Sequence, residues 1–272
     1  MRLATSLILF GIASACGGEA QAPPVVAETS FQQWSLPDPL REISGLALTQ
    51  DERLLAVADE QAIVYEIDYE AGRLIKSFAL GRPVERGDFE GIAVLADRIW
   101  LMTSDGDLYS AAEGENGEQV DFERVETGIG RECELEGLAS IPSPPTLLLL
   151  CKEGRKRKKL RVHRWAPGEG VTGEIELPEK SMEAATGTGK IRPSGLEIEP
   201  TTGDWIIVAA GQRAVFRVAP DGEFRGVIMR LEADRHRQAE GIAITADGRL
   251  LIADEGGRGR ARLAVYPAYD KE

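Results

Sequence analysis

The phrase Ile43-Ser44-Gly45-Leu46-Ala47-Leu48 decides the fold, because close variants of it return four more times along the chain. Each copy places Ser or Glu before a glycine and an apolar residue after it. The other copies are Phe89-Glu90-Gly91-Ile92-Ala93-Val94, Leu135-Glu136-Gly137-Leu138-Ala139, Pro193-Ser194-Gly195-Leu196-Glu197-Ile198 and Ala239-Glu240-Gly241-Ile242-Ala243-Ile244. The spacings between the glycines are 46, 46, 58 and 46 residues. Equal spacings around one phrase indicate a repeat protein, in which each period forms one supersecondary unit.

Each phrase is followed by further short apolar runs separated by turns. The second runs are bounded by Asp or Gly, which is typical of buried strands; they cover residues 54–58, 99–102, 147–150, 205–208 and 250–253. A third, more alternating run follows in every repeat. The first four repeats also carry a weaker fourth run, such as 74–80 or 224–231. We therefore expect four short strands per repeat and no helix, with an insertion between the third and fourth phrases where the spacing reaches 58.

The fifth repeat reaches the end of the chain after its third strand. The segment 31–36 alternates Trp34 and Leu36 on one face and can supply the missing strand. Such a strand would close the ring and pair the exposed edges. The sequence therefore predicts an all-β, five-bladed β-propeller of four-stranded blades, spanning residues 31–267 as one domain. An open β-sandwich, the alternative, explains neither the equal period nor the missing strand.

The amino end has the pattern of an export signal. Arg2 precedes an apolar stretch at 3–12, which is too short to span a bilayer, and small residues lead to Cys16. A cysteine at this place resembles the lipobox of bacterial lipoproteins, although Ala13 stands where Leu is usual. We expect a signal peptide at 1–15, a lipid on Cys16, and a linker at 16–30 that tethers the domain to a membrane facing the periplasm or cell surface. A soluble secreted protein cut nearby is the alternative.

Charge and composition exclude some partners. With 32 Lys and Arg against 45 Asp and Glu, the formal net charge is −13, so nonspecific binding to nucleic acid is not expected. Membrane contact is expected through the lipid anchor alone. The two histidines, His163 and His236, are too few for a zinc site built mainly from histidines. His236 lies between two arginines on the loop into the fifth repeat and is a weak candidate for a catalytic acid or base.

Export makes a disulfide between Cys133 and Cys151 possible, because an oxidising compartment preserves such bonds. The midpoint of the two positions falls in a proline-rich turn, and strands on either side of it would bring the cysteines opposite each other. Two separate buried thiols are the alternative.

The residue before each phrase glycine should lie at one mouth of the central channel. These five residues are Ser44, Glu90, Glu136, Ser194 and Glu240. The three glutamates are the expected metal ligands, and a possible outer shell behind them consists of Ser44, Asp59, Glu153, Ser194, Asp254 and Glu255. Converging carboxylates repel one another unless they are protonated or bridged by a cation, and an all-oxygen ligand set favours calcium or magnesium.

A salt-bridged ring without metal is the alternative to that cation site. An arginine stands three to six residues before each phrase glycine, at positions 41, 86, 131, 192 and 237. Any of these could pair with the nearby glutamate.

The ordered series Ser-Gly, Glu-Gly, Glu-Gly, Ser-Gly, Glu-Gly, with Lys152-Glu153 after the second strand of the third repeat, resembles the SdiA-regulated family of bacterial exported propellers. The resemblance covers residues 31–267. It implies a five-bladed propeller associated with calcium, neighboured by proteins labelled for a phytase-linked, esterase-like activity.

Carried onto this chain, the resemblance implies calcium ligands at Glu90, Glu136 and Glu240, with Glu153 and Glu255 behind them. The chain departs from the expected acidic pattern at Asp105-Gly106 and at Gly211-Gln212. We expect a binding protein that holds a divalent cation at the channel mouth and presents that face to a small anionic ligand or an envelope protein. The alternative is a metal-dependent hydrolase of phosphoester or lactone type.

Overall fold

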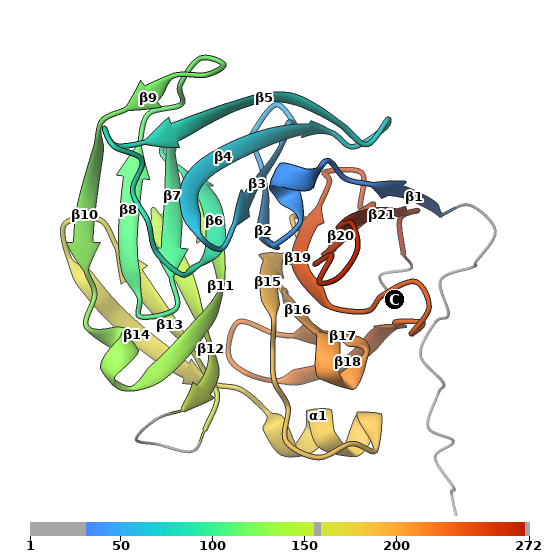
Figure 1. Cartoon of the computed structure of the whole chain (residues 1–272). Helices are drawn as coiled ribbons and strands as arrows, with labels where there is room; N and C mark the ends of the chain where they lie inside the picture. The colour runs from blue at the N-terminus through green and yellow to red at the C-terminus, as the bar shows by residue number, and fades with distance from the viewer. Residues whose placement is uncertain (1–30, 155–158, 270–272) are drawn as a thin grey trace, which may run out of the picture.

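A computed structural model describes residues 31–154 and 159–269. The expected signal peptide, Cys16 and the linker lie outside the described residues. The described chain forms five sheets arranged in a ring (Figure 1), each built on four antiparallel strands, so the predicted β-propeller is confirmed. Blade one consists of β2 (Ile43–Leu48), β3 (Leu54–Ala58), β4 (Gln61–Asp68) and β5 (Arg73–Leu80), and blade two of β6 (Phe89–Leu95), β7 (Arg98–Thr103), β8 (Asp107–Ala111) and β10 (Phe122–Glu126). Blade three consists of β11 (Cys133–Ile141), β12 (Thr146–Gly154), β13 (Arg161–Ala166) and β14 (Gly170–Glu176), and blade four of β15 (Gly195–Ile198), β16 (Trp205–Ala209), β17 (Ala214–Val218) and β18 (Phe224–Arg230). Blade five consists of β19 (Ala239–Ile244), β20 (Leu250–Asp254), β21 (Arg262–Tyr266) and β1 (Gln32–Ser35).

The amino-terminal strand closes the ring, as the sequence predicts. β1 runs antiparallel to β21, from Gln32 opposite Val265 to Ser35 opposite Arg262. The closing strand is also tied to blade one, because the Trp34 indole Nε1 donates to the carbonyl of Tyr69 at 3.0 Å. This pairing covers the outer edge of β21, which would otherwise be exposed.

The core lies between blades, where the flat faces of neighbouring sheets pack together. β16 is buried along its whole length because both of its faces are covered. This explains why the second strand of each repeat is a continuous apolar run, whereas an alternating run marks a half-exposed strand. The largest of these interfaces, between blades three and four, is built around Trp205 and Phe216.

Two elements differ from the sequence-based expectation. The insertion between the third and fourth phrases contains a helix, α1 (Glu179–Thr186), which contacts the outer strand β18. The expectation of no helix was therefore wrong. Only Met182 of this helix is buried, so its sequence carries no apolar stripe that periodicity could detect.

The second difference is β9 (Gln119–Val120), which pairs in parallel with β5 and extends blade one to five strands. Short 3₁₀ turns, η2 (Asp38–Leu40), η3 (Ile129–Arg131) and η4 (Ala210–Gln212), complete the described elements. Among the described residues, no helix has the length and apolar character that crossing a membrane requires.

Candidate functional site at the channel mouth

The phrase glycines bring the five inner strands into contact around the axis. A Cβ built on Gly91 would lie 2.7 Å from the Leu138 Cβ, and one on Gly241 would lie 2.7 Å from the Leu46 Cγ. At Gly195 it would lie 2.2 Å from the Glu240 carbonyl oxygen. Each glycine therefore meets the inner strand of the next blade, and only a residue without a side chain fits. The cavity left at the axis has a volume of about 10 Å³, so the channel is closed and the site is a shallow mouth.

A β-bulge aims the residue before the glycine at this mouth. In blade two, Phe89 faces Thr103 and Gly91 faces Met102, which leaves Glu90 as the extra residue. Glu136 and Glu240 are extra residues at the same place in blades three and five, as is Ser44 in blade one. A bulge redirects a side chain that would otherwise follow the strand alternation. All three glutamates and Ser44 line the cavity at the axis, whereas Ser194, the fifth residue expected at the mouth, is not among its lining residues.

Burial and mutual repulsion disfavour the charged forms of these glutamates. Burial, together with Glu136, Asp88 and Glu240, raises the pKa of Glu90 to about 9. Burial raises the pKa of Glu136 to about 7 although Lys152 opposes the shift, and burial also raises the pKa of Glu240 to about 7. The mouth therefore holds protons at neutral pH that an ordinary surface glutamate would release.

The three glutamates differ in their partners. The Lys152 ammonium donates to Glu136 and lies 3.6 Å from Glu134. The Gln238 amide donates to Glu240 at 3.0 Å. Glu90 has no hydrogen-bond or ion-pair partner among the described residues. Within the same residues, no ion pair joins any of the three glutamates to an arginine, so the arginine-bridged ring is not the arrangement of this mouth.

Lys152 is the residue whose role the sequence reasoning missed. It follows Cys151 on β12, and the resemblance placed it only as a neighbour of Glu153. Burial works against its charge, but Glu136, Glu134 and Glu90 together hold the pKa of Lys152 above its usual value. No local pattern in the sequence indicates this role, because the place of Lys152 beside Glu136 depends on the bulge between β11 and β12. The Glu153 backbone lies opposite Glu134, and its side chain is outside the described residues.

The predicted outer residues divide into two groups. Ser44 and Ser194 donate their hydroxyls to the carbonyls of Phe89 and Ala239, both at 2.7 Å, and so join neighbouring blades. Asp254 is buried in blade five and lies 2.7 Å from the Nδ1 atom of His236.

His236, the weak catalytic candidate, uses both ring nitrogens inside blade five. Its Nε2 atom lies 2.6 Å from the hydroxyl of Tyr266. With its side chain fully buried between Asp254 and Tyr266, His236 holds β20, β21 and the preceding loop together. The structure does not bring it to the mouth with the glutamates.

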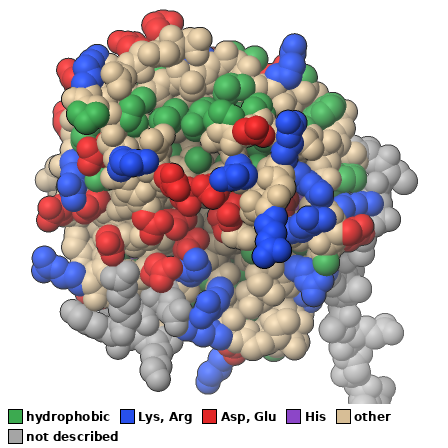
Figure 2. All heavy atoms as spheres, viewed as in Figure 1, with side chains coloured by type: hydrophobic (Ala, Val, Ile, Leu, Met, Phe, Trp, Pro, Cys, Tyr) green, Lys and Arg blue, Asp and Glu red, His purple; other side chains and the backbone are tan. Residues whose placement is uncertain are grey.

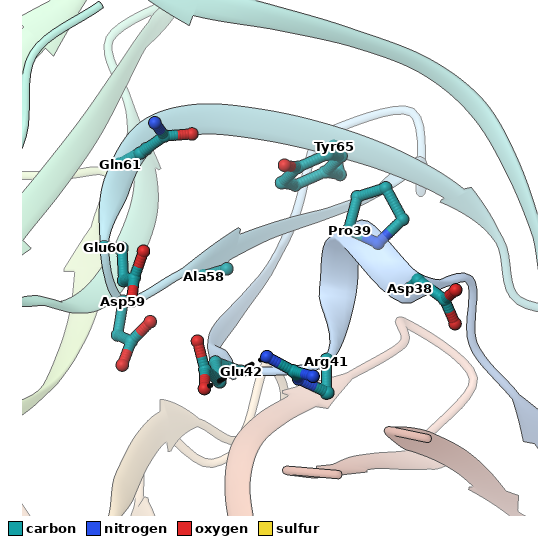
Figure 3. Close-up of a pocket in the computed structure, with 9 residues that line it drawn as sticks. All are labelled: Asp38, Pro39, Arg41, Glu42, Ala58, Asp59, Glu60, Gln61 and Tyr65. Atoms are coloured by element: carbon teal, nitrogen blue, oxygen red, sulfur yellow. Dashed lines mark ion pairs between the residues drawn. The ribbon is translucent and has the colours of Figure 1, made fainter. Parts of the chain in front are cut away.

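Asp59 and Glu255 extend the negative charge from the mouth toward blades one and five. Asp59 borders a cavity of about 110 Å³ together with Glu42 and Glu60 (Figure 3). The pKa of Asp59 is raised to about 6, mainly by burial and further by the negative charges of Glu42, Glu60 and Glu255. Its Oδ1 atom is buried without a hydrogen-bond partner. Burial and the nearby Glu42 likewise raise the pKa of Glu255.

The surrounding face is mixed in charge. Figure 2 shows Asp and Glu side chains gathered in the middle of one face, with Lys and Arg side chains beside them. Arg237 and Arg258 are exposed and have no ion-pair partner among the described residues. Arg41 and Arg260 are paired at 3.8 and 3.6 Å with Glu42 and Asp38.

A closed ring of five blades whose inner strands aim acids at one end of the axis defines a five-bladed β-propeller with an acidic channel mouth. The chain belongs to the SdiA-regulated family, whose model matches residues 28–258. A search among curated proteins gave no match.

Solved structures share the fold at low sequence identity. The glutaminyl cyclase of Myxococcus xanthus has a TM-score of 0.61 and 14% identity, over 92% of this chain and 100% of that one. A luciferin-regenerating enzyme has a TM-score of 0.56 and 8% identity, over 88% and 96% of the two chains. A PQQ-bound aldose sugar dehydrogenase from Streptomyces coelicolor has a TM-score of 0.51 and 14% identity, over 90% and 99%. At such identities the likeness is one of fold.

Proposed function

We propose that the channel mouth binds a divalent cation, calcium by the chemistry of its donors, and that this face is presented to an anionic ligand or an envelope protein. The observation that carries the proposal is Glu90, a carboxyl group at the mouth that has no protein partner in the described chain and whose pKa is raised to about 9. Bringing a cation to such a group would relieve the repulsion among the glutamates.

The donor set fits a hard cation. Glu90 and Glu240 offer carboxylate oxygens from the inner strands of blades two and five, and none of the residues that line the cavity offers a softer ligand. Glu136 is already engaged by Lys152, so it would join the ligands only after exchanging that partner. After Lys152 is counted against the three glutamates, a fully ionised mouth keeps two negative charges, which a divalent ion would neutralise.

Lys152 makes the proposal sharply testable, because its ammonium competes with the metal for the same carboxylates. Metal analysis of the purified protein, with thermal melting in EDTA and in calcium, measures binding directly. Calcium at a hundredfold excess over its dissociation constant should add about 2.7 kcal/mol of stability. We expect Glu90→Gln and Glu240→Gln to lose most of this gain, Lys152→Met to bind calcium more tightly, and Glu169→Gln, an exposed carboxyl elsewhere, to behave as wild type. Absence of bound metal together with absence of any calcium effect on melting would contradict the proposal.

The ligand of this face is proposed to be anionic. A cation at the mouth would attract carboxylate or phosphate groups together with Arg237 and Arg258, whose guanidinium groups have no ion-pair partner among the described residues. Inorganic phosphate titrated into the calcium-loaded protein is the probe. Arg237→Gln combined with Arg258→Gln should weaken phosphate binding and leave calcium binding unchanged; equal phosphate binding by this variant would remove the arginines from the proposal.

One observation favours an enzyme as the second candidate. Glu136 and Glu240 have pKa values raised to about 7, where a carboxyl group exchanges protons readily at neutral pH. A calcium-dependent hydrolase of phosphoesters or lactones could use one of them as acid or base. Turnover of such a substrate panel by wild type that is lost in Glu136→Gln would favour this candidate, and inactivity across the panel would favour the binding protein.

A further inference from the structure

A second set of metal-ligating side chains lies inside blade three. Cys133, Cys151 and His163 come from the adjacent strands β11, β12 and β13, and all three are buried, with 2, 1 and 4% of their surface exposed. Their donor atoms all lie within 4.8 Å of one another, and they form the one such group of three among the described residues.

The sheet register explains why these side chains meet. Leu135 lies opposite Cys151, and Leu149 lies opposite His163. Cys133 and Cys151 are each two residues from one of these paired positions, so all three side chains project from the same face of the blade.

The structure joins Cys133 and Cys151 by a disulfide whose Cα atoms are 5.7 Å apart. In this form the sulfur atoms carry no negative charge and are not available as thiolate ligands. Two electrons and two protons from a dithiol reductant would break the S–S bond and give two thiols, while the reductant itself becomes a disulfide. Binding of a metal ion would then release the two thiol protons.

His163 is the observation that indicates a ligand. Neither of its ring nitrogens makes a hydrogen bond within the described chain, although the residue is almost fully buried. Its nearest charged neighbour is Glu174, with 3.8 Å between Nδ1 and Oε2. Burial lowers the pKa of His163, which keeps the ring neutral with a lone pair available for coordination.

We propose that blade three contains a redox-controlled site for a thiophilic metal ion, closed by the Cys133–Cys151 disulfide and opened by its reduction. Two thiolates and one imidazole select ions such as Zn(II) or Cu(I) over calcium. The site is therefore separate from the channel mouth in both its position and its chemistry. The disulfide and the metal are mutually exclusive occupants of the same sulfur atoms.

Zinc is the probe that tests the proposal. The full chain is reduced with a phosphine under anaerobic conditions, freed of reductant, mixed with zinc and passed through a desalting column before metal analysis. We expect about one zinc per reduced chain, and affinity lower by about tenfold or more in His163→Gln and in Cys133→Ser. Cobalt in place of zinc should give a thiolate-to-metal charge-transfer band that the same variants lack.

Two controls separate this site from others. Oxidised wild type keeps the whole channel mouth, so equal zinc binding before and after reduction would assign the metal to the mouth and overturn the proposal. His163→Gln retains both cysteines, and a thiol titration shows whether its disulfide still forms. Full zinc binding by His163→Gln, or a reduced wild type that stays unfolded in excess zinc, would also overturn it.

Discussion

Neutralising Glu90 should stabilise the metal-free protein, and the gain should depend on pH. Glu90→Gln keeps the shape of the side chain and removes its titration. The pKa of Glu90 is raised from 4.5 to about 9 by burial and by Glu136, Asp88 and Glu240. The folded protein therefore binds this proton more tightly than the unfolded chain, so the contribution to stability is complete below pH 4.5 and is lost as the pH rises toward 9.

The size of the effect follows from the interval between the two pKa values. Each pH unit above 4.5 removes about 1.4 kcal/mol from wild type relative to the variant, which amounts to about 3 kcal/mol at pH 7. Urea denaturation in EDTA at several pH values between 4 and 8 measures the difference. Glu169→Gln, exposed and remote from the mouth, is the matched control and should follow wild type throughout. A difference between Glu90→Gln and wild type that stays constant with pH would refute the reasoning.

Three other outcomes are expected. Gly91→Ala should destabilise the fold by about 1–3 kcal/mol in denaturant unfolding, because its Cβ would lie 2.7 Å from the Leu138 Cβ. Gly173→Ala, whose Cβ would have no atom within 4 Å, should change the unfolding free energy little. Equal effects of the two variants would contradict the close packing of the inner strands. Replacing both Cys133 and Cys151 by serine should lower the unfolding free energy by about 3 kcal/mol, as expected for a bridge that spans 18 residues, and an unchanged urea midpoint would show that the bridge does not form in the wild type. Cys16→Ser should move the protein from the membrane fraction to the soluble fraction of the envelope, and an unchanged distribution would refute anchoring through Cys16.

The fold could be predicted from the sequence because the same strand pattern occurs five times along the chain. Five copies of one phrase, together with a last repeat that lacks a strand, fix both the number of blades and the closing role of the segment around Trp34. The helix α1 and the strand β9 occur once each, carry few buried residues and have no second copy for comparison. Both form against a strand of a blade, α1 against β18 and β9 against β5, and a single sequence does not reveal these contacts.

The sequence indicated which glutamates meet at the channel mouth, but not which side chains they contact. The register placed Glu90, Glu136 and Glu240 at one mouth, and the structure brings them to the cavity at the axis. The position of Lys152 depends on a bulge that shifts β11 against β12 by one residue. The burial of His236 depends on Tyr266, which comes from a strand that starts 26 residues later in the chain. Neither relation leaves a local signal in the sequence.

In each of the five phrases, the glycine has a structural role, and the residue before it determines the chemistry of the site. The glycine packs against the next blade, so it is required in every repeat, whereas the residue before it varies and lines the mouth in blades one, two, three and five. In blades one and four that residue is a serine, whose hydroxyl bonds to the backbone of the following blade. In the other three blades it is a glutamate, and none of these glutamates bonds to the backbone of the following blade in the described chain. Between the described residues, three of the five junctions thus lack a hydrogen bond that the other two possess. They carry instead carboxyl groups whose charged form is disfavoured by burial. Since a serine at these positions would satisfy the fold, the glutamates are better explained by a ligand at the mouth than by the stability of the propeller.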